Sequence, residues 1–307
     1  MNSIRFIKPR IFKAHLAVLT ANIIYGANYS IAKQVMPEFI KPFGFIMIRV
    51  CIATLLFWMC SFWFPREKIK AAHYKKLFVC AVFGVAINQL FFFKGLSLTS
   101  PVNSGLIMIT NPIFVLLLAA ILINYRITFM RILGIVLGIS GCLILLFFGS
   151  KIADANSSPL GDFYILLNSL SYALYLVMIK PLMKIYHPIT IMKWVFLFGS
   201  VMVIPLGVNE FNQISWSTFT SGIWWSIVFV IIGTTFFAYL FNTLALRELS
   251  SSQVSIYIYL QPLLAALFAI MLSTDMLHIL HIVSALIIFA GVYLTSKPIE
   301  NPSEIKG

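Results

Sequence analysis

Ten apolar runs of about 20 residues dominate the sequence and limit what the chain can fold into. They lie near residues 14–32, 43–64, 77–96, 102–123, 130–148, 160–179, 189–208, 222–246, 252–273 and 277–296. A helix needs about 20 apolar residues to cross a bilayer, whereas a spanning β-strand alternates over about ten. The chain is 61% hydrophobic and 10% charged, against about 25% charged in soluble domains. These features predict an all-α integral membrane protein with ten transmembrane helices.

The distribution of Lys and Arg predicts how the spans are oriented. With the N-terminus in the cytoplasm, inner segments carry 17 of the 22 cations and outer ends carry four, while Arg49 lies inside a span. Cytoplasmic loops are enriched in Lys and Arg, so topology explains the formal net charge of +13. We therefore expect a multi-pass protein of the cytoplasmic (inner) membrane with both termini in the cytoplasm. Its expected partner is the lipid bilayer, and we expect it to bind no nucleic acid.

One stretch occurs twice, at residues 95–142 and 245–292. Proline, glycine and amide residues recur at a fixed offset of 150. Leucine matches are expected by chance in a chain this apolar, whereas matches of these residue types at one offset are not. The matched pairs include Ser100 and Ser250, Asn103 and Gln253, Asn111 and Gln261, Pro112 and Pro262, and Gly141 and Gly291. Because a repeat at a fixed offset determines the architecture, the chain is predicted to consist of two related halves.

Each half holds five predicted spans, and five is odd. The second half must then enter the membrane from the opposite side, so the two halves are inverted repeats. Transporters use this geometry, with the substrate site near the midplane where the repeats meet. The expected organisation around a central cavity is a cytoplasmic tail at 1–13, a five-helix repeat at 14–148, an outer linker at 149–159, a second five-helix repeat at 160–296 and a cytoplasmic tail at 297–307.

Prolines interrupt the fourth predicted span of each half. Pro112 frees the carbonyl of Met108, and Pro262 frees that of Ile258, because a proline removes the hydrogen bond to the residue four positions earlier. Broken helices in matching positions of two halves are a pointer to a transport site. The alternative is a pair of packing kinks, since proline is common in membrane helices.

Polar side chains inside the spans are the candidates for lining the cavity. An amide in hydrocarbon costs free energy unless it has a partner, so the faces that carry amides should point inward. Amides also join helices to one another, and that alternative stays open. The candidate cavity residues are Tyr25, Asn28, Asn88, Gln89, Asn103, Asn111, Asn168, Tyr172, Tyr175, Asn242, Gln253, Tyr257 and Gln261.

Arg49 and Lys33 are the candidates for a charged or gating role. Arg49 lies about 10 Å deep in a predicted span at 1.5 Å per residue, and an intramembrane charge is a functional hypothesis by default. Arg49 either binds substrate or is structural, and Asp162 is a candidate ion partner for it. All nine acidic residues fall in loops, at span ends or in the tail, which gives no support to proton coupling through a mid-membrane carboxylate.

The last span of each half is nearly featureless apart from glycines such as Gly134, Gly138 and Gly141. These two spans are predicted to pack together, and a homodimer through them is left open. The nucleotide-binding, zinc-protease and hydrolase motifs are missing, and no C-x-x-C occurs. We expect no catalytic residues, no cofactor and no bound metal.

The chain resembles the EamA family of the drug/metabolite transporter superfamily over about residues 14–296. The matching pieces are Tyr25-Gly26 with Lys33, Pro42 with Arg49, the stretch from Leu96 to Pro112, the glycines Gly134 and Gly141, and the second-half counterparts through Pro262 and Gly291. The family's repeats commonly carry a Glu just after the fourth helix, where this chain has Tyr125 and Asp275. The resemblance implies a ten-helix carrier with a central cavity that exports or exchanges small metabolites such as amino acids.

The repeat and the resemblance together predict a secondary carrier of a small-molecule solute that works by alternating access. Amides and tyrosines would bind a polar solute, and Phe91, Phe92, Phe93, Phe236 and Phe237 are candidate gates. The alternative on the same fold is a carrier of nucleotide- or lipid-linked sugars. An intramembrane enzyme and a membrane sensor that transports nothing are remoter alternatives.

Overall fold

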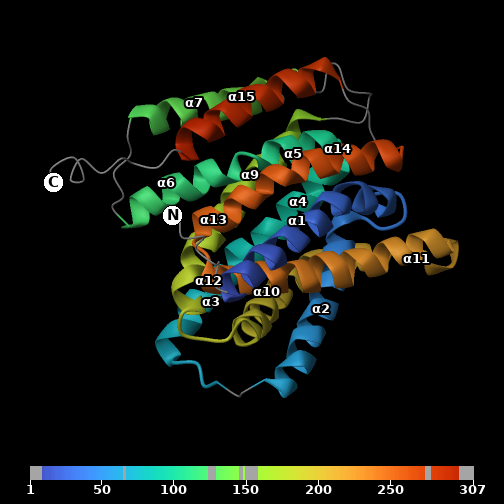
Figure 1. Cartoon of the computed structure of the whole chain (residues 1–307). Coiled ribbons are helices and arrows are strands. Elements are labelled where there is room, and N and C mark those ends of the chain that lie inside the picture. The colour runs from blue at the N-terminus through green and yellow to red at the C-terminus, as the bar shows by residue number, and fades with distance from the viewer. Residues whose placement is uncertain are drawn as a thin grey trace.

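The computed structural model describes residues 9–64, 67–123, 129–144, 148, 158–273 and 278–296. Within these residues the protein is all-α, as predicted, and contains no strand. The α-helices are α1 (Pro9–Val35), α2 (Pro42–Cys60), α3 (Ala71–Ala81), α4 (Ile87–Leu98), α5 (Pro101–Met108), α6 (Asn111–Ile123), α7 (Phe129–Ile144), α9 (Pro159–Met183), α10 (Pro188–Phe211), α11 (Ser221–Val228), α12 (Tyr239–Glu248), α13 (Ser251–Ile256), α14 (Gln261–Met271) and α15 (Ile279–Ser296) (Figure 1). The positions of Tyr125 and Asp275 lie outside the described residues.

Seven helical segments of the described chain are long and apolar enough to cross a membrane by length and composition. They are Pro42–Trp63, Ala71–Leu98, Pro101–Leu122, Pro159–Met183, Pro188–Phe211, Ser221–Glu248 and Ser251–Met271. The helix α1 has 27 residues, but its polar side chains lower its hydropathy, and α7 and α15 contain shorter apolar segments. A multi-pass membrane protein is therefore confirmed, while the count of ten spans stays a prediction.

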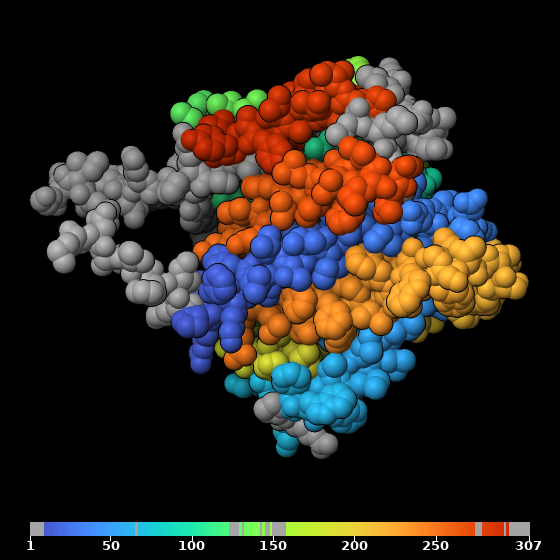
Figure 2. Space-filling view, turned by 45° about the vertical axis from the view of Figure 1, so that its right-hand side comes forward, coloured from blue at the N-terminus to red at the C-terminus, as the bar shows by residue number. Residues whose placement is uncertain are grey.

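The helices form a layered bundle in which two pairs occupy the edges. At one edge α7 packs against α15, and at the other α2 packs against α10 (Figure 1). The helices α1, α4, α5, α6, α9, α12 and α14 lie between these pairs. The space-filling view shows α1 crossing the face of the molecule, with α14 on one side and α11 on the other (Figure 2).

Corresponding helices of the two halves make corresponding contacts. The first helix of the first half, α1, packs against α12 and α14 of the second half. The first helix of the second half, α9, packs in the same way against α4 and α6 of the first half. Each half therefore uses its first helix to hold the third and fourth helices of the other half, and neither half forms a separate bundle.

The first helix of each half also carries a lysine, and this lysine binds the carbonyl end of the third helix of the same half. Lys33 Nζ on α1 donates to the carbonyls of Leu96 at 2.9 Å and Thr99 at 2.8 Å, at the end of α4. Lys180 Nζ on α9 donates to the carbonyls of Leu246 and Leu249, at the end of α12. The last carbonyls of a helix have no partner within the helix, and a cation also interacts favourably with that end of the helix dipole.

Regular helix geometry is interrupted in the third and fourth helices of both halves. Next to Pro112, α5 ends at Met108 and α6 begins at Asn111. Next to Pro262, a 3₁₀ segment at Tyr257–Leu260 separates α13 from α14. The π-helical segments Val82–Ala86 and Phe229–Ala238 join α3 to α4 and α11 to α12. Such π segments are rare and occur frequently at functional sites, and all four irregularities lie in the middle of apolar spans.

The contact between α7 and α15 depends on glycine. A Cβ atom at Gly291 of α15 would lie 2.5 Å from the Gly134 carbonyl oxygen and 2.5 Å from the Gly138 backbone nitrogen, both on α7. A Cβ atom at Gly141 would lie 3.1 Å from the carbonyl oxygen of Ser284. Small residues let helix backbones approach this closely in membranes, where van der Waals packing drives helix association.

We expect the substitution Gly291→Ala to lower thermal stability. The added methyl group would force α7 and α15 apart, and such overpacking costs about 1–3 kcal/mol. The matched control is Gly222→Ala in α11, where a Cβ atom would lie 3.8 Å from the Thr220 hydroxyl oxygen, an ordinary van der Waals contact. Unfolding of the detergent-solubilised proteins is followed by tryptophan fluorescence. The Gly291 variant should unfold several degrees below the control, and equal midpoints would contradict the glycine contact.

Candidate solute-binding cavity

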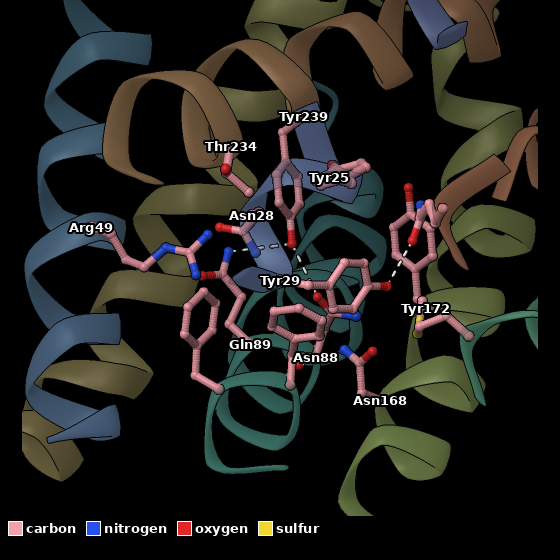
Figure 3. Close-up of a pocket in the computed structure, with 14 residues that line it drawn as sticks. Tyr25, Asn28, Tyr29, Arg49, Asn88, Gln89, Asn168, Tyr172, Thr234 and Tyr239 are labelled. Carbon is pink, nitrogen blue, oxygen red and sulfur yellow. Dashed lines mark hydrogen bonds between the residues drawn. The ribbon is translucent and has the colours of Figure 1, made fainter. Parts of the chain in front are cut away.

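A cavity lined by aromatic rings and several polar side chains lies in the middle of the bundle, where helices of both halves meet (Figure 3). The centres of water molecules can reach about 60 Å³ inside it, which is room for several waters. In Figure 3, Arg49 enters from α2 on one side and Tyr172 from α9 on the opposite side. The lining residues are Tyr25, Asn28, Tyr29, Arg49, Asn88, Gln89, Phe92, Phe93, Met108, Asn168, Tyr172, Thr234, Tyr239 and Gln261.

Eight of these residues were selected from the sequence as cavity or charge candidates. They are Tyr25, Asn28, Arg49, Asn88, Gln89, Asn168, Tyr172 and Gln261. They come from α1, α2, α4, α9 and α14, which are far apart in the sequence. The structure therefore brings together polar groups from both halves, whereas the assignment of these residues to solute binding stays a proposal.

Two further candidates lie directly behind the lining. Asn242 Nδ2 donates to the hydroxyl oxygens of Tyr172 at 2.9 Å and Tyr25 at 3.3 Å, so it connects two lining tyrosines at corresponding positions of the halves. Tyr175 stacks on Tyr172 with ring centroids 5.9 Å apart. Both residues support the shape of the cavity without lining it.

Asn103 and Asn111 are buried in contacts between helices. Asn103 Nδ2 donates to a carboxylate oxygen of Asp162 at 3.3 Å. Asn111 Nδ2 donates to the carbonyl of Ser169 on α9 at 2.7 Å. These asparagines join α5 and α6 to α9, which is the role that amides have between membrane helices.

Gln253, Tyr257 and Lys33 also lie outside the cavity lining. Gln253 is exposed and forms a capping box with Ser250 at the start of α13. The Tyr257 hydroxyl lies 2.7 Å from His15 Nδ1 on α1. Lys33 binds the end of α4, as described above. The sequence pattern placed Gln253, Tyr257 and Gln261 on one face, and the 3₁₀ segment between α13 and α14 changes that register, because it has about 3.0 residues per turn.

Tyr29, Met108, Thr234 and Tyr239 line the cavity but are not among the candidate residues that the sequence predicted. Tyr29 lies one helical turn after Tyr25, and Tyr239 corresponds to Gln89 at the repeat offset of 150, so both carried a signal. Thr234 corresponds to Gly84, and the lining position of Met108 follows from the break between α5 and α6. Phe92 and Phe93, considered only as gates, form part of the wall.

The Tyr239 hydroxyl is the centre of the largest hydrogen-bond group at the cavity. It accepts from Gln89 Nε2 at 3.2 Å and lies 3.0 Å from both the Asn88 Oδ1 and the Gly84 carbonyl oxygen. Tyr239 is on α12 and the other three groups belong to the first half. The residues Gln89 and Tyr239 occupy corresponding positions of the two repeats, so their hydrogen bond joins equivalent positions of the two halves.

A second group of hydrogen bonds fixes Gln261 of α14 against α1. Gln261 Nε2 donates to Asn22 Oδ1 at 2.7 Å, and Gln261 Oε1 accepts from the Tyr29 hydroxyl at 2.8 Å. Asn22 Nδ2 in turn donates to the Val18 carbonyl at 2.8 Å. All the polar atoms of this amide have partners, so Gln261 has one orientation at the cavity wall.

Arg49 is held by one hydrogen bond and one aromatic ring. Its Nε donates to Thr235 Oγ1 at 2.7 Å, and its guanidinium carbon lies 3.9 Å from the ring centroid of Phe93. The side chain is 1% exposed, and its Nη1 is buried with no hydrogen-bond partner. Asp162, the ion partner considered from the sequence, instead accepts hydrogen bonds from Thr99 and Asn103.

Several acceptors around the cavity also lack a protein partner. They are the side-chain oxygens of Asn28, Gln89, Asn168 and Thr234. Burying such a group without a hydrogen bond costs about 1–3 kcal/mol, and buried waters commonly fill this need. The cavity is therefore bordered by buried polar atoms, including Arg49 Nη1, that make no hydrogen bond within the described protein.

The long apolar helices and the cavity between them define a multi-pass membrane protein with polar side chains gathered at its centre. A model of the EamA-like transporter family matches residues 12–147 and again residues 159–297. The chain belongs to this family, and the two matches agree with the duplication read from the sequence.

Relatives match most of the chain and most of their own lengths. The "Uncharacterized transporter YyaM" of Bacillus subtilis is 26% identical, with 94% of this chain and 95% of the relative covered. The "Protein WALLS ARE THIN 1" of Arabidopsis thaliana is 24% identical, with 93% and 82% covered. A solved structure titled "Crystal structure of protein" has a TM-score of 0.63 at 15% identity and covers 92% of this chain and 96% of its own. That similarity shows the fold.

We expect Tyr239→Phe to destabilise the protein. The change removes one hydroxyl from a buried group of three neighbours and leaves acceptors without a donor, at a cost of about 1–3 kcal/mol. The control is Tyr164→Phe on α9, whose ring stacks on Phe91 and whose hydroxyl makes no hydrogen bond in the described part of the chain. Thermal unfolding in detergent should show a lower midpoint for the Tyr239 variant alone. Equal losses in both variants would show that the hydroxyl of Tyr239 adds nothing.

Proposed function

We propose that this protein is a secondary carrier that exports or exchanges a small polar metabolite, such as an amino acid, and that it is not an enzyme. The observation that carries the proposal is the buried cavity, to which both halves contribute amides, tyrosines and one arginine. A cavity with room for several waters, about 60 Å³ for their centres, supports a small solute better than a nucleotide- or lipid-linked sugar. Membership of a transporter family supports transport as the activity.

The proposed architecture is a bundle of ten spans in two inverted five-helix repeats around the cavity. Three observations support it. The helices α1 and α9 pack against corresponding helices of the opposite half. The lysines Lys33 and Lys180 bind the ends of corresponding helices. The residues Gln89 and Tyr239, which correspond at the repeat offset, meet at 3.2 Å beside the cavity.

The proposed mechanism is alternating access, in which one half rocks or bends relative to the other around the solute. The contacts of Lys33 with α4 and those of Lys180 with α12 lie at opposite membrane faces in the proposed topology, and each ties the first helix of a half to the end of the third helix of the same half. The break between α5 and α6, the 3₁₀ segment before α14 and the two π segments are the places where helices would bend. Hinges in transporters are commonly discontinuous helices of this kind.

The proposed setting is the cytoplasmic membrane, with both termini inside, as the Lys and Arg distribution favours. The outward faces of α7 and α15 carry exposed apolar side chains such as Val136 and Leu286, which suits contact with lipid. A homodimer through this pair of helices remains a prediction, which chemical cross-linking in native membranes would test.

We expect Gln261→Leu to reduce solute flux by roughly tenfold or more. Leucine removes an oriented amide from the cavity wall, and a lost hydrogen bond of about 1.4 kcal/mol corresponds to a factor of ten. Purified protein is reconstituted into liposomes, and counterflow of a panel of labelled amino acids and other small polar metabolites is measured. The matched control is Gln213→Leu, an exposed glutamine that accepts a hydrogen bond from Lys41.

The two possible failures of this experiment have different meanings. If the unaltered protein moves no solute of the panel faster than empty liposomes do, the carrier proposal is wrong for these solutes. If transport occurs but the Gln261 and Gln213 variants transport equally well, the cavity wall at α14 does not bind the solute.

A further inference from the structure

The cavity contains one cation and no anion among its lining residues, and we propose that it binds a small solute carrying a carboxylate, which Arg49 holds. This inference rests on the proposed transport function and names the class of solute. The Arg49 side chain is buried, and a guanidinium group stays protonated in proteins. A buried charge is stable only when it is paired or well hydrogen-bonded.

Nothing in the described protein neutralises Arg49. No Asp or Glu is present among the lining residues, and Asp162 is bound to Thr99 and Asn103. Glu210 accepts hydrogen bonds from the backbone of Phe43 and Gly44 at the start of α2. The positive charge of the cavity therefore has to be compensated by something that enters it.

The two interfacial lysines show how this protein satisfies a structural cation. Lys33 donates to three backbone carbonyls, those of Leu96, Ser97 and Thr99, and Lys180 donates to two. Among the residues that the structure describes, Arg49 donates to no carbonyl and has one hydrogen bond, to the Thr235 hydroxyl. We would expect a purely structural arginine at this depth to bind backbone carbonyls as the lysines do, and Arg49 does not.

The geometry of Arg49 leaves its outer nitrogens for a ligand. Nε is fixed by Thr235, whose hydroxyl donates in turn to the Val230 carbonyl within the π segment at 2.8 Å. One side of the guanidinium is covered by Phe93, and Nη1 has no partner. A guanidinium group suits a carboxylate because its parallel N–H donors match the two carboxylate oxygens.

The remaining free groups indicate what else the solute carries. The side-chain oxygens of Asn28, Gln89 and Asn168 are acceptors without a donor, and Asn168 is fixed because its Nδ2 donates to the Asn88 carbonyl at 2.7 Å. An ammonium or hydroxyl group on the solute would supply donors to such oxygens. The solute class that fits is a small amino or hydroxy acid, with its carboxylate at Arg49.

The test is ligand-induced stabilisation of the purified full-length protein. A ligand that binds only the folded state raises the unfolding midpoint. The probes are L-leucine, L-threonine and L-phenylalanine, each compared with its own carboxamide, together with L-lactate and lactamide. We expect at least one acid to raise the midpoint by several degrees at millimolar concentration, and its amide to have little effect. The carboxamide has nearly the same shape as the carboxylate but lacks its negative charge.

The variants separate ligand binding from folding. Arg49→Gln should abolish the difference between acid and amide, Arg49→Lys should retain part of it, and Arg247→Gln, an exposed arginine on α12, should leave it unchanged. Gel filtration and the midpoint without ligand show whether each variant is folded. If Arg49→Gln does not fold, the acid–amide comparison on the unaltered protein still decides the question.

Three results would overturn the inference: equal stabilisation by an acid and its amide, no stabilisation by any of the acids, or a folded Arg49→Gln variant that still prefers acids. Transport of the same probes into liposomes distinguishes failure of the carboxylate site from failure of the carrier proposal. If the protein transports an amide as fast as the corresponding acid, the carrier proposal stands and the carboxylate site is wrong. If it transports neither, the carrier proposal itself fails for these solutes.

Discussion

The arrangement of this protein depends on the cost of a polar group without a partner in an apolar surrounding. Within hydrocarbon, each unpaired amide, hydroxyl or charge costs kilocalories per mole. The spans carry many such groups, and the fold collects them along the contact between the halves. Tyr239 and Gln261 hold two of the resulting groups of hydrogen bonds. Apolar faces then remain for lipid, and the polar contact becomes the place where a solute can be bound.

The sequence was sufficient to predict the fold class and about half of the residues that line the cavity. Long apolar runs leave helices as the only regular structure that satisfies the backbone in lipid. Tyr25, Asn28, Asn168 and Tyr172 lie on helices without interruption, and the inward-facing position expected of polar groups in spans is the one they have at the cavity. Tyr257 and Gln253 were placed beside Gln261 by the same spacing, but the 3₁₀ segment at Tyr257–Leu260 lies between them and alters the register.

The remaining differences come from partners that no pattern in one chain reveals. An amide that binds a carbonyl of a neighbouring helix, such as Asn111 with Ser169, looks in sequence like an amide that faces a cavity. Thr234 became a lining residue because a π segment carries it, and π segments have no reliable sequence signal. Arg49 was recognised as unusual from its depth alone, but its lack of a carboxylate partner required the structure.

The paired lysine contacts have a consequence for the proposed cycle. Lys33 and Lys180 are the same residue type, occupy corresponding helices and bind the same kind of backbone acceptor. Each contact joins the first and third helices of the same half, so a rocking motion of one half against the other would leave both contacts intact. In the proposed cycle the lysines therefore keep these two helices of each half moving together.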